Sequence, residues 1–178
     1  NIFIFITEQS IIIREITLNK IKYVGLSLLL SLLIPNEIDR FKITQNPSNN
    51  FYLEFNLDNI EIDKNNEYSK IKTSLKTGTT GVMGMPKLPS YSTLIMVDPT
   101  KDYSLEYTVK DSYVINDITV IPNQQIVDGL EKIYIDDMDD SFYNSNSEYP
   151  YDNVTVSDPL IMRDIVVLNL SVVPFKYR

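Results

Sequence analysis

Apolar and polar residues alternate along most of the chain beyond residue 50, with the period of two that is typical of β-strands. The stretch FYLEFNLDNIEI opens this pattern and places Phe51, Leu53, Phe55 and Leu57 on one face. The alternation slips by one residue at Asn59 and then resumes, which predicts a bulge.

Further runs with the same alternation are YSTLIMV (91–97), YSLEYTV (103–109), YVINDITVI (113–121) and IVVLNLSVV (165–173). Polar pairs such as Asp-Pro and Asn-Asp separate or interrupt them. Short strands at intervals of about 10 residues, with no helical heptads after residue 35, predict an all-β fold, an antiparallel β-sandwich. The expected core includes Leu53, Phe55, Leu105, Tyr107, Val166, Leu168 and Leu170.

The first 35 residues show a different pattern. The basic stretch Lys20-Ile21-Lys22 precedes YVGLSLLLSLLIP, an apolar run shorter than the roughly 20 residues that a membrane-spanning helix needs. This order predicts a secretory signal, cleaved between Pro35 and Asp39, with a buried core helix as the alternative. We expect residues 1–19 either to lie upstream of the true start or to form a strand. The predicted divisions are a leader-like segment (1–35), a linker (36–49) and a β-domain (50–178).

Composition narrows the chemistry. The chain has no Cys and no His, which excludes thiol nucleophiles, imidazole bases, disulfides and most transition-metal sites. A formal net charge of -8 argues against a nucleic-acid partner, because phosphates require a concentrated basic face. We therefore expect a domain without catalytic residues or cofactors, and without membrane contact beyond the signal segment.

Two loops resemble known sites only in part. Three glycines lie in TGTTGVMGMPKLP, but their spacing fits neither a dinucleotide fingerprint nor a P-loop, so we expect a structural loop. The stretch DDMDDSFYNSNSE fits positions 1, 3, 5 and 12 of a calcium loop, although Phe142 replaces the glycine of its sharp turn. An acidic solvated loop is the main interpretation, and the calcium alternative would use Asp137, Asp139, Ser141 and Glu148. The paired carboxylates do not establish a glycosidase site.

The segment TVSDPLIMRDIVVLNLSVVPFKY resembles the end of the propeptide domain of gingipain-like cysteine peptidases, peptidase family C25. GMPKLPSYSTLIMV is similar to a second motif of that family, and FYLEFNLDNIEI and DITVIPNQQ are weaker matches in the same order. Together they cover residues 50–178. The residues that carry the resemblance are Gly84, Pro86, Leu88, Pro89, Ser157, Asp158, Pro159, Arg163, Asp164, Pro174 and Tyr177.

The resemblance implies a jelly-roll-like sandwich that serves as the N-terminal prodomain of a secreted bacterial cysteine peptidase, periplasmic or extracellular. Its partner would be the cognate peptidase domain of the same precursor, which it would inhibit and help to fold. The family also implies that the chain stops before its last strand, which would leave an open sheet edge near the C-terminus.

In the family, a loop from the sandwich enters the specificity pocket of the peptidase, and in Arg-specific members it carries an Arg. The matching stretch here contains no Arg, and Lys132 is its single cation. An ordinary surface loop is the alternative. The loop comprises Gln124, Gln125, Ile126, Val127, Asp128, Gly129, Leu130, Glu131 and Lys132.

Two further alternatives remain open. Arg163 is expected to pair with Asp158 or Asp164 at the entrance of a strand, or else to mark a processing site. A carbohydrate-binding or adhesive module is the alternative function, with exposed tyrosine rings as stacking platforms. The candidate rings are Tyr143, Tyr149 and Tyr151.

Overall fold

Antiparallel β-strands make up most of the structure. The computed structural model describes residues 2–4, 9–16, 41–45, 51–57, 59–65, 67–73, 77–124, 126–127, 130–131 and 138–178. Every ladder between strands in these ranges is antiparallel. The predicted fold class, all-β and antiparallel, is confirmed, whereas the finer jelly-roll description stays a prediction.

The first large sheet has the strand order β3-β4-β2-β9. Its strands are β2 (Gln9–Ile16), β3 (Phe41–Gln45), β4 (Phe51–Phe55) and β9 (Asp102–Thr108). The alternation seen in the sequence turns Leu53 and Phe55 into the core, where both side chains are fully buried.

The second large sheet has the order β13-β15-β8-β7, and β14 also pairs with β15. Its strands are β7 (Gly78–Thr79), β8 (Pro89–Val97), β13 (Val154–Val156), β14 (Leu160–Met162) and β15 (Ile165–Val172). The register pairs Leu168 with Ile95 and Val172 with Tyr91, and all four side chains are buried. One face of this sheet therefore belongs to the core.

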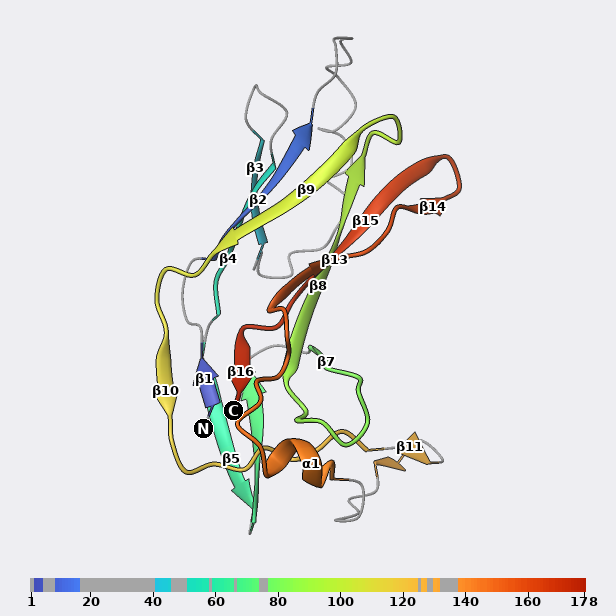
Figure 1. The fold of residues 1–178 in the computed structure, drawn as a ribbon. Helices are drawn as coiled ribbons and strands as arrows, with labels where there is room; N and C mark the ends of the chain where they lie inside the picture. The colour runs from blue at the N-terminus through green and yellow to red at the C-terminus, as the bar shows by residue number, and fades with distance from the viewer. Residues whose placement is uncertain are drawn as a thin grey trace.

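The two large sheets share that core, as the rings of Phe55 and Tyr91 show with centroids 4.9 Å apart. The predicted core is confirmed for Leu53, Phe55, Leu168 and Leu170, and Leu105 and Val166 pack against it partly buried. Tyr107 is a correction, because 37% of its side chain is exposed. Its strand, β9, diverges from β8 toward its C-terminal end (Figure 1), and residues 106–114 are all exposed.

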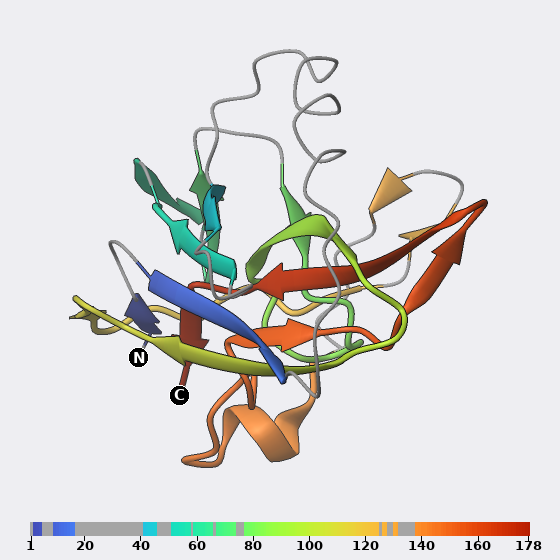
Figure 2. The same ribbon diagram turned by 90° about the horizontal axis from the view of Figure 1, so that it is seen from above.

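Smaller elements form the other end of the molecule (Figure 1), where the first and last strands of the chain lie side by side (Figure 2). A third sheet has the order β10-β1-β16, and two hairpins, β5-β6 and β11-β12, accompany it. These elements are β1 (Ile2–Ile4), β5 (Ile60–Asn65), β6 (Tyr68–Thr73), β10 (Tyr113–Ile115), β11 (Ile126–Val127), β12 (Leu130–Glu131), α1 (Asp140–Tyr143) and β16 (Phe175–Tyr177).

Two local expectations differ from the structure. The slip at Asn59 is no bulge: the chain leaves the first sheet after β4 and enters the β5-β6 hairpin, and Asn59 has a positive φ of 39°. The run expected at 113–121 forms a strand only to Ile115. The last strand, β16, is the edge strand of its sheet, with β1 on one side and an isolated bridge from Tyr149 to Tyr177 on the other.

The N-terminal segment contributes strands. Of the two alternatives for residues 1–19, the structure has the strand, since β1 pairs with β10 and β16 and β2 pairs with β4 and β9. The leader-like run at 24–34 and the cleavage region at 35–39 lie outside the described residues, so both stay predictions. No helix in the described ranges has the length and apolar character needed to cross a bilayer.

Candidate functional site

The glycine-rich loop folds against the segment that leads into the predicted inhibitory loop. The Gly84 N–H donates to the Asn123 carbonyl at 3.0 Å, and the Asn123 N–H donates to the Met85 carbonyl at 2.8 Å. Gly84 has a φ of 77°, a left-handed conformation that glycine adopts without steric cost. The structural role expected for this loop therefore includes holding the neighbouring segment in place.

A buried hydroxyl completes this contact. Thr80 Oγ1 accepts hydrogen bonds from the Leu88 N–H at 3.0 Å and from Asn123 Nδ2 at 3.2 Å, and it donates to the Pro86 carbonyl at 2.8 Å. Thr80, Leu88 and Asn123 are all buried. Because unmade hydrogen bonds are costly in a dry interior, this network fixes the relative position of the two segments.

The chain beyond the predicted loop contacts the same glycine at Asp139. The Asp139 N–H donates to the Gly84 carbonyl at 3.1 Å, and the Asp139 carboxylate caps α1 by accepting from the Phe142 N–H at 3.1 Å. Hydrogen bonds from the Ser141 hydroxyl and from the Phe142 N–H lower the pKa of Asp139. We call Thr80, Gly84, Met85, Asn123 and Asp139 the loop clamp.

The predicted inhibitory loop begins at this clamp. Gln124 is buried beside Asn123, and the chain then forms the short β11-β12 hairpin, in which Val127 pairs with Leu130. The hairpin projects from the lower part of the molecule, away from the two large sheets (Figure 1). The remaining predicted positions, Gln125, Asp128, Gly129 and Lys132, lie outside the described residues.

The C-terminal family motif, which begins at Ser157, includes a different projection, the β14-β15 hairpin. Ser157 marks the change from β13 to β14: its N–H donates to the Asn169 carbonyl, and its hydroxyl accepts from the Asn169 N–H, both at 2.9 Å. Arg163 and Asp164 form the two-residue turn at the tip, where Arg163 has a φ of 56° and is exposed. The structure shows no ion pair of Arg163 among the described residues, so the expected carboxylate contact is not made.

The end of this motif makes a corner between two sheets. Pro174 is buried between β15 and β16, and Asn153 Nδ2 donates to the carbonyls on both sides of it, Val173 at 2.7 Å and Phe175 at 3.0 Å. Tyr177 follows, buried against the rings of Phe142 and Tyr143. The motif residues after Asp164 thus have packing roles.

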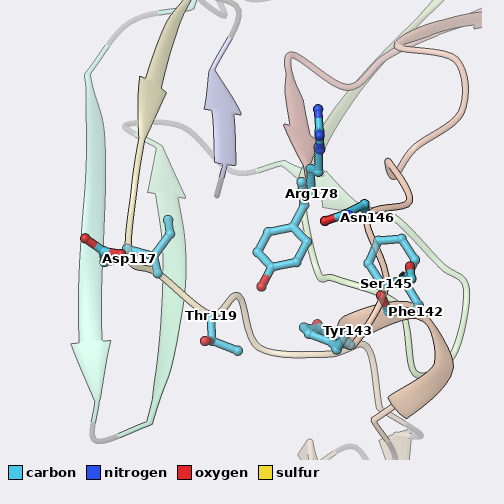
Figure 3. Close-up of a pocket in the computed structure, with 9 residues that line it drawn as sticks. Asp117, Thr119, Phe142, Tyr143, Ser145, Asn146 and Arg178 are labelled. Atoms are coloured by element: carbon cyan, nitrogen blue, oxygen red, sulfur yellow. Dashed lines mark hydrogen bonds between the residues drawn. The ribbon is translucent and has the colours of Figure 1, made fainter.

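A pocket of about 550 Å³ opens between α1, the segment 117–119 and the end of β16 (Figure 3). Aromatic rings and hydroxyls line it, and the Tyr143 hydroxyl donates to the Val120 carbonyl at 2.7 Å. Burial raises the pKa of Tyr143 well above that of a free tyrosine, and burial also raises the pKa of Tyr177. The neutral hydroxyls can donate and accept hydrogen bonds, and Asp117 and Arg178 also line the pocket.

The structure brings together only some residues of the calcium alternative, in which Ser141 hydrogen-bonds Asp139, and only some of the tyrosine alternative. Asp139 caps α1, and Glu148 pairs with Lys176 at 3.4 Å, while Asp137 is outside the described ranges. Within those ranges no three carboxylates lie close enough to share an ion. Tyr143 and Tyr149 pack around Phe142, whereas Tyr151 is 88% exposed, so the three rings form no common platform.

Sequence reasoning missed the buried polar residues that hold this end together, namely Thr80, Asn123 and Asn153. The available signal was a polar residue next to an apolar run, as in IPNQ and DNVTV. A single polar residue at such a position is equally compatible with a turn and with a buried anchor. Its hydrogen-bond partners, which the sequence does not show, distinguish the two roles.

Comparison with known proteins agrees with the resemblance in the sequence. A family model described as Propeptide_C25 matches residues 42–178, which include both motif segments and the loop clamp. No curated protein and no solved structure matches the chain. A match over this share of the chain places it in the family: the chain belongs to the propeptides of peptidase family C25, the gingipain-like peptidases.

Proposed function

We propose that this propeptide inhibits the cognate cysteine peptidase domain of its own precursor and assists its folding, with residues 124–132 as the inhibitory element. The loop clamp is the observation that carries the proposal. It ties Asn123 and Asp139, one residue before the stretch and seven residues after it, to a single loop. A segment that is anchored on both sides, here at Asn123 and Asp139, loses less conformational entropy on binding, which raises its affinity.

The chemistry of the loop limits what it can fill. Lys132 is the one cation in residues 124–132, and Ile126, Val127 and Leu130 are its apolar side chains. A peptidase with an acidic pocket would take Lys132, and a peptidase with an apolar pocket would take one of the other three. A sandwich domain laid across the cleft would bury roughly 1,600 Å² in total, as protease inhibitors do.

The proposed location follows from this role. A precursor that is exported before activation needs its peptidase blocked until it reaches the periplasm or the outside of a bacterial cell. The leader-like segment at residues 20–34 suits that route.

Inhibition in trans tests the proposal. The purified chain is added to its cognate peptidase, and the inhibition constant is measured with a small substrate. Alanine at Lys132, or at Ile126, Val127 and Leu130 together, should weaken inhibition at least roughly 30-fold, because truncating a central anchor typically costs 2 kcal/mol or more. Lys42→Ala is the matched control, since Lys42 is an exposed cation on β3, at the far end of the molecule.

One result would overturn the assignment of the loop. If all four alanine replacements leave inhibition unchanged while Arg163→Ala abolishes it, the β14-β15 tip enters the cleft instead. Folding assistance is measured separately, as the yield of active peptidase after dilution from denaturant with and without the chain. An equal yield in both samples would contradict that part of the proposal.

A further inference from the structure

Two strands of the family-matched region, β9 and β10, pair with strands that lie before that region in the sequence. Within the described residues, β9 pairs only with β2, in a register that runs from Ser10↔Thr108 to Ile16↔Asp102. Likewise β10 pairs only with β1. The matched region begins at residue 42, so both partners lie outside it.

The two preceding strands are central, not peripheral. β2 lies between β4 and β9, and β1 lies between β10 and β16. Ile2 is fully buried, and the register sets Ile11 opposite Leu53, which is also fully buried. Without residues 2–16, β4, β9, β10 and β16 would each expose a row of backbone N–H and C=O groups, which is costly in a packed domain.

The covalent link from these strands to the matched region contains the apolar run at residues 23–35. Residues 17–40 join β2 to β3 and contain the apolar run whose removal the sequence predicts. Cleavage there would break the covalent link between β1 and β2 and the matched region. The position between β4 and β9 and the position between β10 and β16 would still need a strand.

We propose that the position between β4 and β9 and the position between β10 and β16 form a strand-acceptor site, with residues 2–16 as an exchangeable occupant. The site takes an extended peptide in antiparallel register. Backbone hydrogen bonds supply the affinity, and the positions opposite buried side chains select apolar residues. The inference is independent of any inhibition of a peptidase.

Nicking the full chain tests this site. A site-specific protease sequence is placed within residues 25–34, the chain is cut, and the products are separated by gel filtration and identified by mass spectrometry. The N-terminal fragment should co-elute with the rest of the chain. A fluorescent synthetic peptide of residues 1–19 should then replace the fragment in a concentration-dependent manner.

Two peptide variants give the matched comparison. Ile11→Ser should weaken binding of the peptide roughly tenfold or more, because Ile11 is in register with buried Leu53. Ile12→Ser should weaken it less than about threefold, because Ile12 is in register with Glu106, which is exposed.

Either of two outcomes would overturn the proposal. The first is loss of the fragment after nicking with an unchanged circular dichroism spectrum and melting temperature, which would mean that the strands are not needed. The second is a dimer of the remaining chain with no fragment bound, which would mean that a second copy fills the site. Equal binding of the two peptide variants would count against the register.

Discussion

The two projecting hairpins, β11-β12 and β14-β15, are held in different ways. The base of the first is fixed by directional hydrogen bonds of the loop clamp, in which Thr80 and Asn123 are buried. The second is held by its backbone ladder, and its side chains are open to solvent: Leu160 is 46% exposed, Ile161 80% and Met162 49%. Both project from the same side of the molecule in Figure 1.

The two hairpins therefore owe their orientation to different interactions. Hydrogen bonds at a buried base fix the direction in which β11-β12 leaves the domain, because each bond has a preferred angle. The β14-β15 hairpin is held instead by its ladder to the large sheet, in which Val166 and Val167 pair with both β14 and β8, and the apolar side chains of β14 stay exposed. Precise insertion into a cleft suits the first hairpin, and the predictions below test this contrast.

Thr80→Val should have the largest effect. The substitution keeps the shape of the side chain but leaves the Leu88 N–H and Asn123 Nδ2 without an acceptor in a buried position. We expect a loss of about 3 kcal/mol in the free energy of unfolding, measured by urea denaturation. Thr79→Val is the control, because Thr79 is exposed and should change the stability by less than about 0.5 kcal/mol. Equal losses for the two variants would argue against the clamp.

Gly84→Ala should cost about 1–2 kcal/mol, because alanine is strained at the left-handed φ of 77°. Gly81→Ala is the matched control, since a Cβ at Gly81 meets nothing within 4 Å and its φ is not left-handed. Urea denaturation measures both variants. If the clamp positions the loop, Gly84→Ala should also weaken inhibition more than Gly81→Ala does.

Tyr143 should make the stability depend on pH in the alkaline range. Its pKa in the folded chain is raised by burial, so folding favours the neutral hydroxyl. This contribution is complete below the unfolded pKa of about 10 and is lost as the pH rises above that value. Tyr143→Phe should cost about 1 kcal/mol at pH 7 and flatten the decline measured between pH 9 and pH 11. Tyr151→Phe, at an exposed position, should leave the profile unchanged.

Ile161→Ser should have the smallest effect on folding, within about 0.5 kcal/mol, because the side chain is 80% exposed on β14. Differential scanning calorimetry of the unsubstituted chain and of the Ile161→Ser variant measures this change in stability. A decrease above 1 kcal/mol would show that this hairpin packs against another part of the molecule, and the contrast with β11-β12 would then fail.

Most of the β-architecture could be predicted from period-two patterning. The runs at 91–97, 103–109 and 165–173 became β8, β9 and β15 with small shifts at their ends. Alternation puts Tyr107 on the core face of β9, but it does not show where the facing sheet ends, and Tyr107 is exposed. The switch of sheets at Asn59 was read as a bulge for the same reason.

The sequence by itself determined the fold class, the absence of Cys and His, and the family resemblance that the family match confirms. These follow from local periodicity and from residue identity, which need no partner. Only the tertiary structure decided that Gly84 holds Asn123 and Asp139, and that β1 and β2 lie inside the sheets. These backbone hydrogen bonds join residues far apart in the chain. Every residue except proline has the same backbone groups, so the side-chain pattern does not indicate which of them will pair.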